Sequence, residues 1–84
     1  MDENTVRELE DLLVTLASAL VEKQDEVKVE SSVEDNTVTL SLRVADEDMG
    51  RVIGRGGKRA QAIRSILKAK ASRSECRVMV DIVD

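Results

Sequence analysis

Glycines and basic residues are interleaved in one short stretch of the chain, Val52-Ile53-Gly54-Arg55-Gly56-Gly57-Lys58-Arg59. Because glycine has no Cβ, this backbone can adopt positive φ and approach a phosphate that a side chain would hold away. Amides at the start of a following helix also favour an anion, since the helix dipole lies behind them. The stretch therefore predicts a phosphate-binding loop, in which Arg55, Lys58 and Arg59 add charge-assisted contacts.

Two better-known phosphate loops do not fit this stretch. A P-loop requires a glycine at the position of Val52 and a serine or threonine at the position of Arg59. A dinucleotide-binding fingerprint that starts at Gly54 requires a third glycine at Arg59 and a strand before the loop. The sequence meets neither requirement, so the phosphate groups of a mononucleotide or dinucleotide cofactor are not the expected ligand.

Charge is distributed unevenly along the 84 residues, whose formal net charge is −4. Residues 1–50 contain 14 acidic and 4 basic side chains, whereas residues 51–73 contain 8 basic side chains and no acidic one. Such segregation gives one face a positive field while the rest of the surface repels polyanions. The glycine loop lies inside the basic segment, which favours a nucleic-acid partner for that face.

Several residue types are absent, and their absence disfavours whole classes of function. The chain has no His, Phe, Tyr or Trp and one Cys. Zinc sites and general acid–base catalysis usually need His or several Cys, so we expect neither an enzyme nor a metal or other cofactor. Cys76 lies in an alternating apolar run and is interpreted as a core residue. No bilayer-spanning stretch or secretion signal is visible, so we expect a cytoplasmic protein.

The first half of the chain predicts a helix and a hairpin. Apolar residues at three-and-four spacing predict a helix from about Thr5 to Val21, with Thr5 and Glu8 as its capping box. Apolar residues then alternate with polar ones in 27–33 and 38–44, which predicts two strands joined by a turn at residues 34–36. Alternation in both strands indicates a sheet with one face on the core and one in water.

The second half predicts two helices around the glycine loop and a last strand. Asp46, Glu47 and Asp48 begin a short helix that ends before Gly54. A longer helix runs from about Lys58 to Ala71, and we expect its inner side to carry Ile63, Ile66 and Leu67. Residues 76–82 alternate as a strand. Because two helices separate the second and third strands, these strands should lie parallel.

These elements give an α+β fold of order αββααβ, with a three-stranded mixed sheet and three helices packed on one face. At this point the sequence resembles KH domains, through Ile53-Gly54-Arg55-Gly56-Gly57 placed between two helices. The extra leading helix and strand resemble the type II, prokaryotic arrangement. Residues 48–54 and the ending Val80-Asp81-Ile82-Val83-Asp84 resemble the small bacterial single-KH proteins of the KhpA family. The resemblance covers nearly the whole chain and implies one KH domain over residues 1–84.

The resemblance also implies a ligand and a site. In KH domains the GxxG loop, here Gly54 to Gly57, clamps the backbone of about four nucleotides of single-stranded RNA, and the bases lie in an apolar groove. That mode suits a chain without aromatic side chains. The expected groove residues are Val52, Ile53, Ala62 and Ile63, each of which also fits a core position. The expected RNA-binding residues are Arg51, Ile53, Gly54, Arg55, Gly56, Gly57, Lys58, Arg59 and Ile63.

By the same resemblance we expect an RNA chaperone or post-transcriptional regulator. It would form a homodimer or pair with a KhpB (Jag)-type protein, with links to peptidoglycan homeostasis and cell shape. Gly56 departs from many relatives, which carry a polar side chain there, and we expect it to loosen the loop. The basic residues farther along the helix, Arg64, Lys68, Lys70 and Arg73, are interpreted as a solvated face. The alternative function is a dimerisation or scaffold domain without RNA binding, which would use Ile66, Leu67, Met79 and Val83 as an apolar surface.

Overall fold

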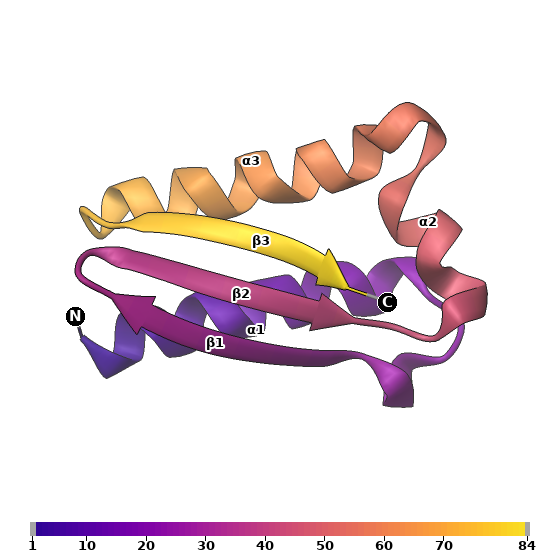
Figure 1. Ribbon diagram of the computed structural model, residues 1–84, viewed down its shortest axis with the longest axis horizontal. Coiled ribbons are helices and arrows are strands. Elements are labelled where there is room, and N and C mark those ends of the chain that lie inside the picture. The colour runs from indigo at the N-terminus through magenta and orange to yellow at the C-terminus, as the bar shows by residue number, and fades with distance from the viewer. Residues whose placement is uncertain (1, 84) are drawn as a thin grey trace.

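The computed structural model describes residues 2–83, and Figure 1 shows their arrangement. The α-helices are α1 (Glu3–Leu20), α2 (Met49–Ile53) and α3 (Lys58–Arg73). The strands are β1 (Lys28–Glu34), β2 (Thr37–Arg43) and β3 (Arg77–Val83). Short 3₁₀ turns, η1 (Gln24–Glu26), η2 (Asp46–Asp48) and η3 (Arg55–Gly57), precede β1, α2 and α3. This order confirms the predicted αββααβ arrangement.

The sheet has the order β1-β2-β3, with β2 in the middle. β1 and β2 form an antiparallel hairpin in which Ser31 lies opposite Leu40. β2 and β3 run parallel, with Leu40 opposite Val80. The parallel pairing confirms the prediction made from the two intervening helices. β3 lies beside α3, and the glycine loop lies at the end of the molecule toward which β3 runs.

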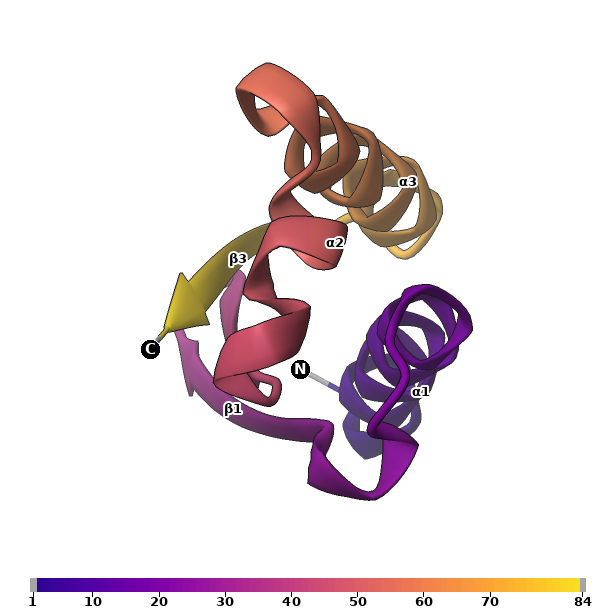
Figure 2. The same cartoon turned by 90° about the vertical axis from the view of Figure 1, so that its right-hand side faces the viewer.

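One face of the sheet is covered and the other is open. Figure 2 shows α1 and α3 side by side on the same face, with α2 at the end of the sheet. Each strand of the pair β2–β3 places alternate side chains toward these helices, because successive side chains of a strand point to opposite faces. The fully or nearly buried core is Leu9, Leu13 and Ala17 of α1, Val38, Leu40 and Leu42 of β2, Ile63, Leu67 and Ala71 of α3, and Val78 and Val80 of β3.

Three expectations need correction. α1 begins at Glu3 rather than Thr5, because the side chain of Asp2 caps it by accepting a hydrogen bond from the amide of Asn4. Ile66, predicted to face inward, is 45% exposed, since it lies about 100° around the helix from the buried Leu67. Val33 is exposed as well, in a shallow hollow beside the first turns of α1 that the helix leaves open.

α1 is the longest helix, with 18 residues. Within residues 2–83, no helix combines the length and the apolar character that crossing a bilayer requires.

Candidate nucleic-acid interface

The bend between α2 and α3 begins at Gly54, whose backbone only glycine adopts with ease. Its φ is 75° and its ψ is 175°. Its amide donates to the carbonyl of Gly50 at 2.9 Å and so ends α2. A Cβ placed on Gly54 would lie 2.9 Å from both Cβ and Cγ of Arg59. The first glycine of the loop is therefore fixed by conformation and by the Arg59 side chain that packs against it.

The rest of the loop is open to solvent. Gly56 and Gly57 have φ of 64° and 78°, and a Cβ on either one would meet nothing within 4 Å. The amide of Gly57 donates to the carbonyl of Gly54, and the amide of Lys58 donates to that of Arg55. Across residues 2–83, no backbone hydrogen bond uses the amides of Arg55 or Gly56, and both residues are exposed. Two adjacent NH groups in η3, just before α3, are thus available to an anion.

Two of the predicted cations lie at this bend without a partner in the described part of the chain. The Arg55 and Lys58 side chains are exposed and make no ion pair or hydrogen bond with any residue from 2 to 83. Each can turn toward a phosphate without first breaking an internal contact. The predicted pairing of free amides with free cations is therefore present at Arg55, Gly56 and Lys58.

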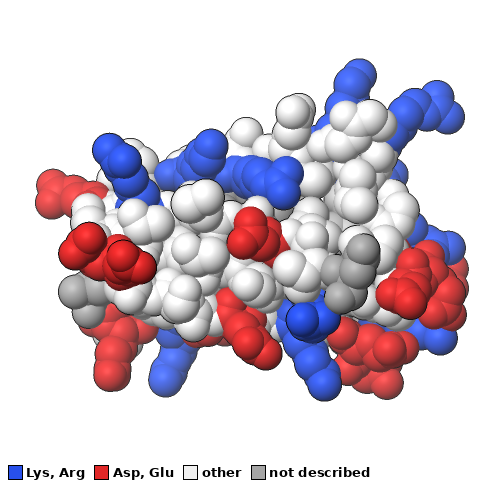
Figure 3. Space-filling view, in the orientation of Figure 1, with Lys and Arg blue, Asp and Glu red and all other residues white. Residues whose placement is uncertain are grey.

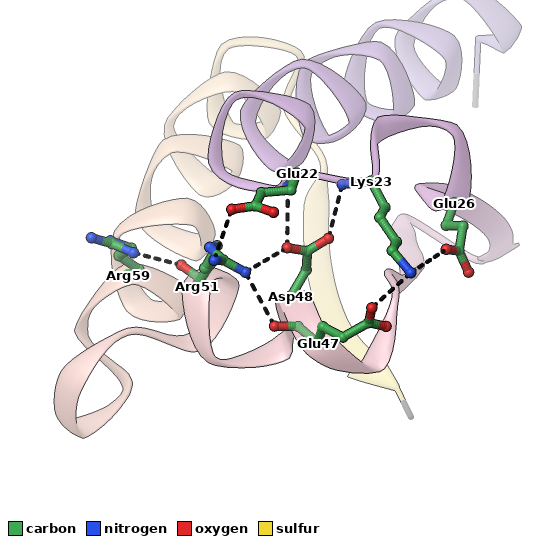
Figure 4. Close-up of polar contacts among 7 residues, drawn as sticks. All are labelled: Glu22, Lys23, Glu26, Glu47, Asp48, Arg51 and Arg59. Atoms are coloured by element: carbon green, nitrogen blue, oxygen red, sulfur yellow. Dashed lines mark hydrogen bonds and ion pairs between the residues drawn. The ribbon is translucent and has the colours of Figure 1, made fainter.

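The other two predicted cations, Arg51 and Arg59, form hydrogen bonds with other residues of the protein (Figure 4). Arg59 donates from Nη1 to the carbonyl of Arg51 at 2.8 Å. Arg51 donates from Nη2 to Oε1 of Glu22 at 3.0 Å. It also donates from Nη1 to Oδ1 of Asp48 at 2.9 Å and to the carbonyl of Glu47 at 3.2 Å. The sequence grouped Arg51 and Arg59 with Arg55 and Lys58, but the structure separates the two pairs.

Asp48 is the buried centre of these contacts, and sequence reasoning missed that role by treating it only as an acid at a helix start. It is 1% exposed. Its Oδ1 and Oδ2 accept hydrogen bonds from the amides of Glu22 and Lys23, each at 3.1 Å. These two amides, and then Arg51, lower the pKa of the Asp48 carboxyl. The one available signal was the spacing of Asp48 and Arg51, three residues apart on a short helix.

The lowered pKa of Asp48 leads to a pH-dependent prediction. A carboxyl whose pKa falls on folding stabilises the protein above its unfolded pKa, about 3.9, and loses that contribution as pH falls through the lower folded value. We expect Asp48→Asn to lower the free energy of unfolding at pH 7, with a difference from wild type that shrinks toward pH 2. Urea titrations at several pH values measure it. Asp46→Asn is the control, because Asp46 is an exposed acid of the same turn; a pH-independent difference for Asp48→Asn would contradict the assignment.

A groove lies between α3 and β3, along the part of α3 from Arg64 to Ala71. It consists of two adjoining hollows of about 220 and 400 Å³, which share Lys68, Val78 and Met79. Arg64 borders the smaller hollow and donates from Nε to the carbonyl of Val80 at 3.1 Å. Met79 is 58% exposed and gives the groove an accessible apolar surface. In Figure 3, Lys and Arg side chains line the upper side of the molecule along α3 and around the loop, whereas most acidic side chains lie at the two ends and along the lower side.

This groove differs from the one expected from the sequence. Val52 is fully buried and Ile63 is 4% exposed, so both belong to the core and cannot contact a base in this conformation. Ile53, at the end of α2, is 37% exposed, so of its two possible places the core is excluded. Ala62 is exposed on α3. The apolar groove surface comes from β3, a strand that the sequence analysis did not assign to the groove.

No feature of the site points to metal ligation. Among residues 2–83, no three His, Cys, Asp or Glu side chains are grouped as ligands. Cys76 is buried at the start of β3, in agreement with its interpretation as a core residue.

Comparison with known proteins gives one consistent result. The family described as KhpA/KhpB, KH domain matches residues 10–82. RNA-binding protein KhpA of Clostridium acetobutylicum is 44% identical over 75 residues, which cover 89% of this chain and all of that protein. RNA-binding protein KhpA of Caldanaerobacter subterraneus subsp. tengcongensis is 44% identical over 73 residues, 87% of this chain and 97% of that protein. No solved structure matched. With its GxxG loop between α2 and α3, the chain belongs to the KhpA/KhpB family of KH domains.

Proposed function

We propose that this protein binds single-stranded RNA without catalysing a reaction, and that the phosphates bind at Gly54–Gly57. The observation that carries the proposal is the pair of exposed amides of Arg55 and Gly56, which have no partner in residues 2–83 and lie beside two unpaired cations. The names of the two relatives, both RNA-binding proteins, support it.

In this proposal the loop binds the RNA phosphates, and the groove binds the bases. The amides of Arg55 and Gly56, just before α3, donate hydrogen bonds to a phosphate, and the dipole of that 16-residue helix adds to the attraction. Arg55 and Lys58 neutralise that phosphate and its neighbour. Bases then lie against Ile53 and Met79 in and beside the α3–β3 groove. With no aromatic side chain to stack on, base binding depends on apolar contact, so the site accepts many sequences.

Salt dependence tests this proposal directly. Each phosphate neutralised on a single strand contributes about −0.7 to the slope of log affinity against log salt. We expect a short single-stranded RNA to bind the wild-type protein with a slope of about −1.4 or steeper, from the two phosphates at Arg55 and Lys58. Fluorescence anisotropy at several salt concentrations measures it. Absence of binding, or a flat salt response, would overturn the proposal.

The partner and the cellular role are part of the same proposal. We infer a role as an RNA chaperone or post-transcriptional regulator in the cytoplasm, in which a homodimer or a KhpB (Jag)-type partner raises affinity by adding a second RNA-binding module. Family membership supports the second of these partners. Links to peptidoglycan homeostasis and cell shape rest on the family resemblance alone.

A second candidate function is a scaffold KH domain that associates through an apolar surface. The exposed side chains of Ile66 and Met79 support it, whereas Leu67, expected on the same surface, is fully buried. Sedimentation velocity separates the two functions. A dimer that forms without RNA, together with a flat salt response, would favour the scaffold.

A further inference from the structure

A continuous set of contacts joins the α1–β1 connection to the glycine loop. Amides of Glu22 and Lys23 donate to Asp48, Asp48 accepts from Arg51, and the carbonyl of Arg51 accepts from Arg59. Figure 4 shows these residues between the end of α1 and the start of α3. The set therefore connects three segments that lie far apart in sequence and ends one residue inside α3.

Arg59 holds both sides of the loop at once. Its backbone belongs to the first turn of α3, and its guanidinium is bonded to the carbonyl of Arg51 in α2, at 2.8 Å. Its side-chain stem lies so close to Gly54 that a Cβ there would be 2.9 Å away. Because α2 and α3 flank the loop, this one side chain fixes the separation of the two helix ends. The position of the free amides of Arg55 and Gly56 depends on that separation.

Arg51 is also held by internal contacts, and the carboxylates around its guanidinium offset its positive charge. Two carboxylates, of Glu22 and Asp48, lie within 3.0 Å of its guanidinium nitrogens. To reach a phosphate, Arg51 would have to leave Asp48, a buried carboxylate, with one partner fewer. Exchange of these internal contacts for a phosphate is unfavourable compared with the use of Arg55 or Lys58, which have none to break.

We propose that Arg51 and Arg59 are positioning residues, which hold the loop amides in place for a phosphate and do not themselves neutralise one. The inference rests on the proposed function and refines it, since it divides four basic residues of one segment into two that contact RNA and two that place the backbone. Asp48 fixes Arg51 and so belongs to the positioning set.

The salt slope distinguishes the two roles. Arg55→Gln removes a phosphate contact, so we expect affinity for single-stranded RNA to fall about tenfold and the slope to become shallower by about 0.7. Arg59→Gln loosens the loop, so we expect a similar fall of about tenfold with the wild-type slope. Arg59→Lys keeps a side chain long enough to donate to the Arg51 carbonyl, for which glutamine is too short, and should restore most of the affinity. Arg73→Gln, at the far end of α3, is the matched control and should change neither quantity.

A measurement on the free protein tests the same inference without RNA. In the wild type and in Arg55→Gln, we expect ¹⁵N order parameters of the loop amides near those of rigid backbone, about 0.85. In Arg59→Gln they should fall toward about 0.6 while the strands keep their values. A slope that becomes shallower by about 0.7 in Arg59→Gln, with unchanged loop order, would overturn the inference and make Arg59 a phosphate contact. If wild type binds no RNA, the proposed function fails, and the order parameters still decide whether Arg59 positions the loop.

Discussion

Replacement of Arg55 and Gly56 together by aspartate is expected to weaken binding of short single-stranded RNA by about a hundredfold or more. By the proposed function, the change removes a charge-assisted contact of about 1.5–3 kcal/mol and places two carboxylates at the proposed phosphate site. The fold should survive, because Gly56 has open space around it and a φ of 64° and ψ of 21° that aspartate tolerates. Fluorescence anisotropy measures the affinity, and circular dichroism with a urea titration checks the fold.

The control for this double variant changes the same charge elsewhere on α3. Arg73→Asp with Ser74→Asp also lowers the net charge by three units, at exposed positions about 22 Å from the loop along the helix. We expect it to weaken RNA binding only slightly, through the general field of the protein. Equal losses of RNA affinity in the two double variants would mean that the basic segment attracts RNA as a whole and that the loop is not a specific phosphate site. An unchanged affinity in a folded Arg55→Asp, Gly56→Asp protein would reject the clamp.

Leu67→Ala is expected to have the largest effect on stability of the changes considered. Leu67 is fully buried where α3 meets the core, and removal of such a side chain costs about 2–5 kcal/mol through lost burial and the cavity left behind. A domain of this size has roughly 5–15 kcal/mol in total, so the variant should be partly unfolded at moderate temperature. Urea and thermal unfolding followed by circular dichroism measure the change.

Ile66→Ala is the matched control, because it removes a side chain of equal size one residue away. Ile66 is half exposed, so we expect a loss below about 1 kcal/mol. A larger loss for Ile66→Ala than for Leu67→Ala would contradict the orientation of α3. A normal monomer stability combined with loss of self-association in Ile66→Ala would instead support the scaffold function.

Much of the fold could be predicted from the sequence because short-range patterns specify it. Alternation in β2 and β3 and the two helices between them were sufficient to predict parallel pairing, now seen as Leu40 opposite Val80. The ends of elements were harder to predict. Thr5 is a residue type that often caps helices, but the Asp2 side chain accepts a hydrogen bond from the amide of Asn4, and α1 begins two residues earlier than predicted. Several residues near a helix start can cap it, and local sequence does not decide among them.

Less of the candidate site could be predicted, because its side chains are sorted by contacts between distant segments. Arg51, Arg55 and Arg59 are the same residue type, and each lies within three residues of a loop glycine. Arg51 differs because α2 packs against the α1–β1 connection, where the amide of Glu22, 26 residues earlier, donates to Asp48. Asp48 in turn accepts a hydrogen bond from Arg51. Apolar periodicity likewise could not decide between groove and core for Ile63. The helix packs on the sheet so that Ile63 is covered, while Met79 of β3 stays exposed.

The parallel pairing of β2 with β3 makes the central strand depend on residues that follow it by about 40 positions. A fragment cleaved between α3 and Arg77 keeps the whole GxxG loop but loses β3, and with it one wall of the groove. The freed edge of β2 would then present unpaired backbone groups next to the uncovered side chains of Val38, Leu40 and Leu42. Such a product should aggregate rather than bind RNA weakly, so proteolysis at the Ser74–Glu75 turn would inactivate the protein even though the GxxG loop stays intact.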